Sequence, residues 1–171
     1  NILVNLRFIE GEEMTESGES VISFEDVYKI FGPNPRGRAF ELTKAGVRKD
    51  EVQRQSGHVV GLTDVSFEVK KGEIFVVMGL SGSGKSTAIR TVNKLHEVTN
   101  GRVVVEGVDV QQLEGTDLQA FRREKMGMVF QHFALFPHRN VIDNTSYSLK
   151  IQGVDKKERR EAAMRALSLV G

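Results

Sequence analysis

The nine residues GLSGSGKST, numbered 79–87, combine three glycines, a lysine and two adjacent hydroxyl side chains. Glycines at this spacing let the backbone curl with its N–H groups pointing inward, which suits a chain of phosphates. The lysine can reach the β- and γ-phosphates as a point charge, and the serine hydroxyl after it can ligate Mg²⁺. The segment fits the phosphate-binding pattern GxxxxGK[ST] of a P-loop, so it predicts a site for a nucleoside triphosphate with Mg²⁺. The predicted contacts are Gly79, Leu80, Ser81, Gly82, Ser83, Gly84, Lys85, Ser86 and Thr87, among which Lys85 is the catalytic candidate and Ser86 the metal ligand.

An alternation of strand and helix patterns must position this loop. The continuous apolar run at 74–78 predicts a strand buried on both faces, and residues 85–96 predict the helix that follows the loop. Strand, loop and helix in this order form the context that the phosphate-binding pattern requires. Further strands are expected at 21–27, 65–69, 103–105 and 127–130, and further helices at 39–44, 50–55 (with Asp50 as N-cap), 116–125, near 141–150 and at 156–170.

Composition excludes several classes of protein. Hydrophobic residues make up 39% and charged residues 27%, which is typical of a globular chain, and no run approaches the roughly 18 apolar residues of a spanning helix. Lys and Arg number 24 against 23 Asp and Glu, so binding to nucleic acid is not expected. The chain has no cysteine, which excludes disulfides and thiol catalysis and suits a reducing cytoplasm.

Residues 1–20 differ in character from the rest of the chain. They hold five glutamates and one basic residue, Arg7. We expect a disordered leader here, with a short edge strand at 2–9 as the alternative. Residues 21–171 carry the predicted α/β elements, and within them residues 33–57 are polar and charged.

Three segments resemble the nucleotide-binding domain of ABC-transporter ATPases. KKGEIFVVMGLSGSGKSTAIRTVNKL is similar to the family's P-loop segment, TNGRVVVEGVDV to its small hairpin and MGMVFQHFALFPHRNVIDN to its Q-loop segment. The resemblance implies that Gln131 is the Q-loop glutamine, a catalytic residue and a ligand to Mg²⁺ or the attacking water. VYKIFG resembles the segment that offers an aromatic ring to adenine; alignment favours Phe31, with Tyr28 as the alternative.

The long insertion at 33–57 resembles the importer ATPases for glycine betaine and proline betaine, although methionine- and amino-acid-importer ATPases remain alternatives. The resemblance implies an α/β P-loop NTPase of the ABC type, with a mixed sheet and surrounding helices, that binds ATP and Mg²⁺. It implies as partners a second copy of the ATPase, an integral-membrane permease and, indirectly, an extracytoplasmic solute-binding protein. It also implies a cytoplasmic location on the inner face of the cell membrane.

Three elements of the family lie outside this sequence: the signature LSGGQ, the Walker B run ending in Asp-Glu, and the switch histidine. Glu106 follows only three apolar residues in the hairpin position and does not replace the Walker B carboxylate. We therefore expect residues 21–171 to be the N-terminal part of a transport-coupled ATPase, truncated before these elements, which binds ATP but barely hydrolyses it alone. Two alternatives remain: another P-loop enzyme such as a kinase, and a genuinely short, non-catalytic nucleotide-binding module.

Overall fold

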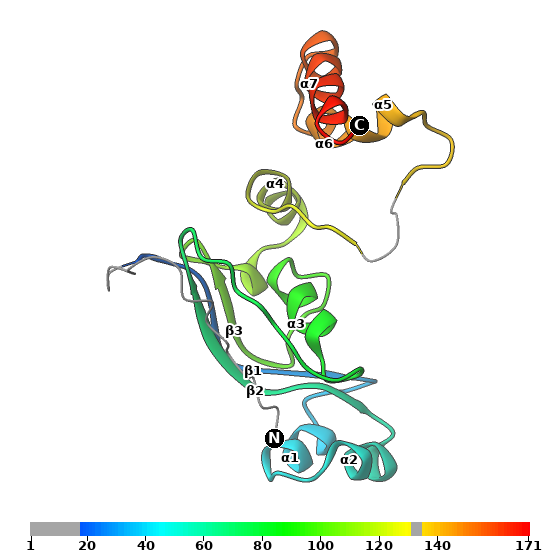
Figure 1. The fold of residues 1–171 in the computed structure, drawn as a ribbon. Coiled ribbons are helices and arrows are strands. Elements are labelled where there is room, and N and C mark those ends of the chain that lie inside the picture. Colours follow the sequence, from blue (N-terminus) through cyan, green and yellow to red (C-terminus); the bar gives the residue numbers. More distant parts are fainter. Residues whose placement is uncertain (1–17, 131–134) are drawn as a thin grey trace. The chain divides into compact units, whose positions relative to one another are not determined.

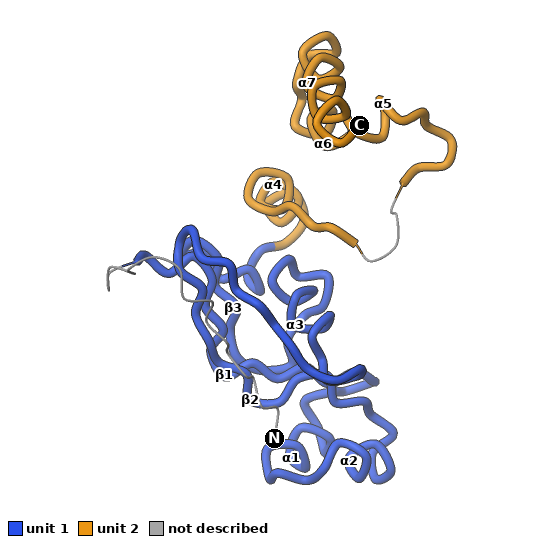
Figure 2. Tube along the Cα trace, viewed as in Figure 1, with its two compact units in different colours: residues 1–113 blue, residues 114–171 orange. Residues whose placement is uncertain are grey.

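The computed structural model describes residues 18–130 and 135–171 (Figure 1). The chain divides into two compact units after Leu113 (Figure 2). The first holds the sheet and the predicted phosphate-binding loop, and the second is helical.

A four-stranded antiparallel sheet in the order β2-β1-β3-β4 forms the base of the first unit (Figure 1). The strands expected at 21–27, 65–69 and 103–105 are confirmed, and all three are longer than predicted. Phe24 on the first strand stacks on Phe67 of the second with 4.3 Å between ring centroids, so aromatic packing joins the two longest strands. The strands are β1 (Ser20–Phe31), β2 (Val59–Lys70), β3 (Asn100–Val105) and β4 (Val108–Asp109), and a short 3-10 helix, η1 (Val110–Gln112), follows.

The first strand begins one residue before the position expected from the sequence. Ser20 is the first residue of β1 and pairs with Lys70. The prediction for 1–17 lies outside the described residues.

The polar insertion at 33–57 folds into two short helices, α1 (Arg38–Lys44) and α2 (Lys49–Ser56), as predicted. Ala39 and Val52, one from each helix, are buried against Ile30 and Val60 of the sheet. Burial of this small apolar face holds the insertion on the ends of β1 and β2.

The expected cap of the second inserted helix was wrong. Arg48 is the N-cap of α2, and Asp50 lies within the first turn, where its carboxylate pairs with Arg48 at 3.2 Å. An acidic side chain in the first turn still interacts favourably with the positive end of the helix dipole. This interaction accounts for an aspartate at position 50 although it is not the N-cap.

One helix follows the glycine loop and lies over one face of the sheet: α3 (Lys85–Val92), in which Ala88 and Thr91 are buried (Figure 1). It is shorter than the 85–96 predicted from the sequence. Lys94 has a left-handed φ of 52°, which ends the helix, and the amide of His96 returns to the carbonyl of Arg90.

The strand predicted at 74–78 is the largest departure from the sequence analysis. The segment is extended but pairs with no strand among the described residues. Ile74, Val76 and Met78 are 91%, 51% and 51% exposed, while Phe75 packs on Phe67 with ring centroids 4.7 Å apart. A strand of this composition is buried on both faces only where strands pair on its edges and elements cover both sides. Here the described residues cover one side.

The strand predicted at 127–130 is also absent from the described residues, and Val129 is 98% exposed. As a result, the described sheet is antiparallel throughout, and the mixed sheet expected from the sequence is not formed within it. Both missing strands are apolar segments whose β-structure depends on pairing partners rather than on local preference.

The second unit contains four helices in its described part. The patterns at 116–125 and 156–170 correctly predict the first and last of them. The helix expected near 141–150 is instead two short ones separated at Ser146, which is buried. Asp155 caps the last helix by accepting a bond from the amide of Lys157 at 2.7 Å. The helices are α4 (Gly115–Lys125), α5 (Val141–Thr145), α6 (Tyr147–Ile151) and α7 (Lys156–Ser168).

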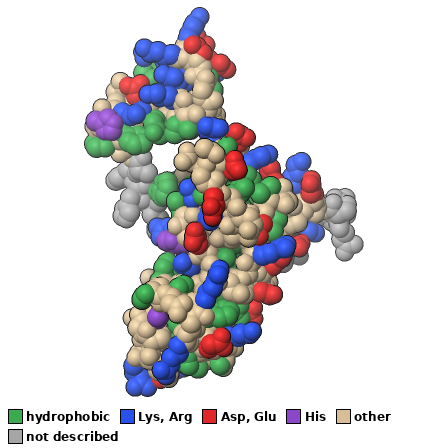
Figure 3. Space-filling model, turned by 180° about the vertical axis from the view of Figure 1, so that it is seen from behind, with side chains coloured by type: hydrophobic (Ala, Val, Ile, Leu, Met, Phe, Trp, Pro, Cys, Tyr) green, Lys and Arg blue, Asp and Glu red, His purple; other side chains and the backbone are tan. Residues whose placement is uncertain are grey.

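Across 18–130 and 135–171, every helix is too short or too polar to span a bilayer. On the face seen in Figure 3, basic and acidic side chains are interspersed. The chain has 24 Lys and Arg against 23 Asp and Glu, so its charges nearly balance.

Candidate functional site

The glycine loop runs from the extended segment into α3 and is closed by its own hydrogen bonds. The Lys85 ammonium donates to the carbonyls of Gly79 and Leu80, both at 2.8 Å, and the Ser83 amide donates to Leu80 at 3.2 Å. An ammonium has three donors, so a third remains for a phosphate oxygen. A charged phosphate forms stronger bonds with an ammonium than neutral carbonyls do, so it can also displace them.

The start of α3 places further donors beside the lysine. The first amides of a helix have no partner within the helix and attract anions. Ser86, an exposed residue in this first turn, offers a hydroxyl next to the loop, and Leu80 at the tip of the loop is 86% exposed. Ser81 and Gly82 are exposed, and Thr87 is half-buried.

Mg²⁺ is commonly held by few protein ligands together with substrate phosphates and waters. The described residues contain no group of three or more acidic or histidine side chains that could hold a metal by themselves. The Ser86 hydroxyl fits the role of a single protein ligand beside a triphosphate. Gln131, the other predicted ligand and catalytic residue, lies outside the described residues.

Gly84, the last residue before the helix, touches the sheet. Its φ is +103°, a conformation that side chains rarely adopt. A β-carbon at this position would also lie 2.4 Å from the carbonyl oxygen of Gly61 on β2. The loop therefore reaches the sheet only because residue 84 has no side chain.

Phe31, predicted to contact adenine, lies at the end of β1 and is half-buried. A β-carbon on Gly61 would meet the Phe31 ring at 2.9 Å on one side and the Thr87 methyl at 3.1 Å on another. Both groups lie on the side of Gly61 where a side chain would project, so the missing side chain lets the Phe31 ring and the first turn of α3 approach the strand together. His96 meets the same ring edge-on at a centroid distance of 5.2 Å.

A cation also contacts this ring. The Lys29 ammonium lies 4.7 Å from the ring centroid of Phe31, which is a cation–π contact. Burial lowers the pKa of Lys29, and the charge of Glu97 partly opposes that effect. Burial, followed by the charges of Lys29 and Arg90, lowers the pKa of His96. Both shifts favour the neutral forms of groups around the ring.

Tyr28, the alternative to Phe31, has a different neighbourhood. Its ring packs edge-on against Phe40 of α1 at 5.3 Å. Burial raises its pKa, and the carboxylate of Asp64 raises it further. Since this ring contacts the inserted helices, the geometry favours Phe31 for the base.

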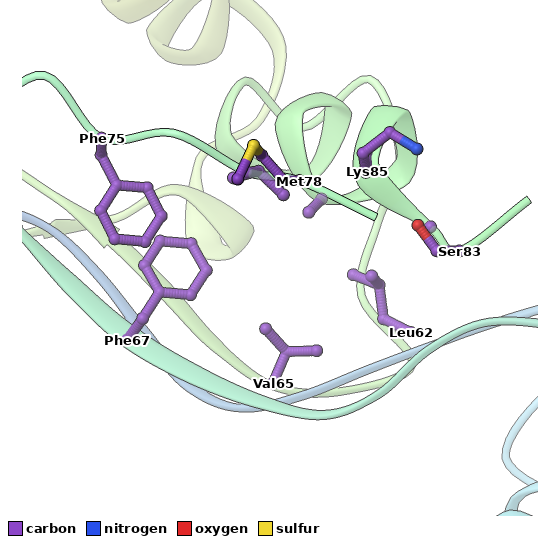
Figure 4. Close-up of a pocket in the computed structure, with 10 residues that line it drawn as sticks. Leu62, Val65, Phe67, Phe75, Met78, Ser83 and Lys85 are labelled. Carbon is purple, nitrogen blue, oxygen red and sulfur yellow. The ribbon is translucent and has the colours of Figure 1, made fainter. Parts of the chain in front are cut away.

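A pocket lies directly behind the glycine loop, between β2, the segment at 74–78 and α3 (Figure 4). Phe67 and Phe75 stack on one another at the end of the pocket away from Lys85. Its wall is almost entirely hydrocarbon, so it suits no triphosphate; we interpret it as incompletely filled core beneath the loop. The lining residues are Leu62, Val65, Phe67, Phe75, Val77, Met78, Ser83, Gly84, Lys85 and Ala88.

Sequence reasoning did not identify Gly61, Lys29 or His96 as neighbours of the site. One signal was available for Gly61, because a glycine among apolar residues in a strand pattern often marks a close backbone approach. Nothing in the local pattern indicated Lys29 or His96, since their proximity to Phe31 arises from tertiary packing.

The chain is similar to known proteins in both sequence and fold. The family model described as ABC transporter matches residues 62–171. The chain is 45% identical over 150 residues to the glycine betaine/proline betaine transport system ATP-binding protein ProV of Escherichia coli (strain K12), covering 88% of this chain and 37% of that protein. It is 47% identical over 150 residues to the glycine betaine transport ATP-binding protein OpuAA of Bacillus subtilis (strain 168), covering 88% and 36%.

Another relative is the trimethylamine N-oxide transport system ATP-binding protein TmoW of Ruegeria pomeroyi, 46% identical over 154 residues, covering 90% of this chain and 45% of that one. Among solved structures, the dimeric post-hydrolysis state of the ATP-binding cassette MJ0796 bound to ADP and Pi superposes with a TM-score of 0.68 and 26% identity. That match covers 86% of this chain and 56% of the other. The chain thus spans less than half the length of the curated relatives named here.

Proposed function

Because the chain belongs to the ABC transporter family, we propose that it binds Mg-ATP through residues 79–87 as the ATP-binding part of an importer. The observation that carries the proposal is the position of Lys85 at the start of α3, with its ammonium folded over the carbonyls of the loop. There it can exchange a neutral carbonyl for a γ-phosphate oxygen without moving the helix. Phe31 stacks on the adenine, and Ser86, with Gln131, holds Mg²⁺.

Lys85→Ala tests this site directly. It removes charge-assisted hydrogen bonds, each of about 1.5–3 kcal/mol, so affinity for a fluorescent ATP analogue with Mg²⁺ should fall about tenfold to a hundredfold. Lys71→Ala, in the exposed turn after β2, is the matched control and should bind as the wild type does. Equal affinities for Lys85→Ala and wild type would refute the P-loop assignment.

We further propose that these 171 residues bind ATP without turning it over appreciably. A positioned carboxylate base contributes about 10²–10⁴-fold to such a reaction, and the sequence holds no apolar run ending in Asp-Glu. Gln131 can orient a water but is a poor proton acceptor. Phosphate release at saturating Mg-ATP should therefore match the buffer rate. Turnover that survives repurification and disappears in Lys85→Ala would place a base within these residues.

For the complete protein we propose ATP hydrolysis that drives uptake of a quaternary amine such as glycine betaine. The identities of 45% to 47% to three transport ATPases for glycine betaine or trimethylamine N-oxide support this class of solute. The partners are a second copy of the ATPase, an integral-membrane permease and, indirectly, an extracytoplasmic solute-binding protein, with the ATPase on the cytoplasmic face of the membrane. Disrupting the gene should abolish uptake of labelled glycine betaine and spare labelled glutamate. Loss of glutamate uptake instead would favour an amino-acid importer.

A further inference from the structure

One side chain of the inserted helices reaches the strand beneath the proposed nucleotide site. Lys49, the first residue of α2, donates from its ammonium to the carbonyl oxygen of Gly61 at 3.3 Å. The side chain is half-buried, and burial lowers its pKa. Desolvating an ammonium is costly unless it is hydrogen-bonded. The bond to Gly61 therefore offsets part of the cost of burying Lys49 at the start of α2.

Gly61 is the point where three parts of the proposed site meet. The same carbonyl oxygen that Lys49 contacts lies against Gly84 at the start of α3, and a β-carbon on Gly61 would lie close to both the Phe31 ring and the Thr87 methyl. The ladder pairs Phe31 with Val59, so its ring reaches two residues along β2 to cover Gly61. Any shift of the strand at Gly61 changes the distance between the ring and the helix.

We propose that Lys49 is a positioning residue through which the insertion at 33–57 holds the base-binding side of the nucleotide site. This inference rests on the proposed binding of ATP. The ammonium anchors the Gly61 carbonyl, and Gly61 sets the position of Phe31 relative to the first turn of α3. The insertion thereby adjusts affinity for the base while contacting no part of the nucleotide.

The effect should be confined to the base. Residues 79–85 are closed by bonds of their own, from Lys85 to Gly79 and Leu80 and from Ser83 to Leu80. These bonds do not involve the insertion. The Phe31 ring, by contrast, packs against the position where Gly61 lacks a side chain, and Lys29 and His96 also contact it. Its distance from the first turn of α3 therefore depends on the strand at Gly61.

The experiment compares Kd for ATP with Kd for inorganic triphosphate, both with Mg²⁺, by calorimetry on the 171-residue chain. Lys49→Met keeps the length and the apolar stem but removes the donor. We expect ATP affinity to fall about threefold to tenfold, the scale of one hydrogen bond, and triphosphate affinity to change less than twofold. Lys49→Arg, which keeps a charged donor, should restore part of the ATP affinity. Lys44→Met, exposed on α1, is the control and should match the wild type.

A double-mutant cycle separates positioning from a general loss of structure. In a Phe31→Ala background, Lys49→Met should leave ATP affinity unchanged, because the ring that it positions is gone. An equal loss in both backgrounds, or equal losses for ATP and triphosphate, would overturn the proposal. If Lys49→Met does not fold, Lys49→Gln replaces it; unfolding of both would assign Lys49 to the fold rather than to the site.

Wild type and Lys85→Ala, measured in parallel, separate this inference from the proposed function. If wild type binds ATP and Lys85→Ala does not, but Lys49→Met matches wild type, then only the role of Lys49 is refuted. If wild type binds neither ligand, the proposed function fails and the positioning role fails with it.

Discussion

The carbonyl oxygen of Gly61 and residue Gly84 approach so closely that a β-carbon on Gly84 would lie 2.4 Å from that oxygen. This contact joins the start of β2 to the turn that opens α3. The two glycines are 23 positions apart, so the contact exists only in the folded chain. It lets the loop that we propose to bind phosphate pack directly against the sheet.

Gly84→Ala should disable the loop. The new methyl group collides with backbone, which cannot rotate away as a side chain can, and the φ of +103° is strained for alanine. We expect affinity for ATP and for inorganic triphosphate to fall together, because the loop itself is displaced. Gly107, in the turn before β4, also has a positive φ of +78°, and a methyl group there would meet no atom within 4 Å, so Gly107→Ala controls for strain alone. Losses of the same size in the two variants would show that the contact with Gly61 is unimportant.

Phe31→Ala should weaken ATP binding but leave inorganic triphosphate binding nearly unchanged. Stacking of a base on an aromatic ring contributes about 1–3 kcal/mol in single-stranded nucleic-acid sites, a scale that corresponds to about fivefold to a hundredfold in affinity. Tyr28→Ala serves as the comparison, because that ring packs on Phe40. Titration of both ligands decides between the two aromatic residues. If Phe31→Ala weakens both ligands equally, then the ring acts in packing.

The stability of the fold should depend on pH through His96. Burial and the charges of Lys29 and Arg90 lower its pKa in the folded chain, while the unfolded chain takes up the proton near pH 6.5. The unfolded state therefore binds more protons below that pH, and stability falls as the solution is acidified. Urea unfolding at pH 7.5 and pH 5.5 should show a smaller pH-dependent loss for His96→Gln than for wild type. His138→Gln is the matched control; an identical slope in all three would contradict this assignment.

The exposed apolar residues at 74–78 should make the isolated chain associate. Ile74, Val76 and Met78 present apolar side chains on an unpaired extended segment, which is a template for pairing between chains. Sedimentation should show mass increasing with concentration, and Ile74→Lys should reduce that increase. Met164→Lys, an exposed apolar residue on α7, should not. A clean monomer with a sharp cooperative melt would contradict the prediction.

Local chemistry determined much of this protein from the sequence alone. The pattern at 79–87 defined the loop and its lysine, because glycine conformation and the spacing of charge are local properties. The helix at 156–168 followed from apolar periodicity and the strand at 65–69 from alternation, while the short helices at 38–44 and 49–56 were expected in a polar segment. The resemblance of VYKIFG to an adenine-binding segment directed attention to Phe31.

Tertiary structure decided what depends on neighbours. The segment at 74–78 reads as a doubly buried strand, yet within the described residues it lies unpaired, because strand formation needs hydrogen-bonding partners that composition does not supply. The contacts of Gly61 with Phe31, Gly84 and Lys49 join residues far apart in the chain. Such contacts arise from the packing of the insertion and α3 on the sheet, which no short sequence pattern encodes.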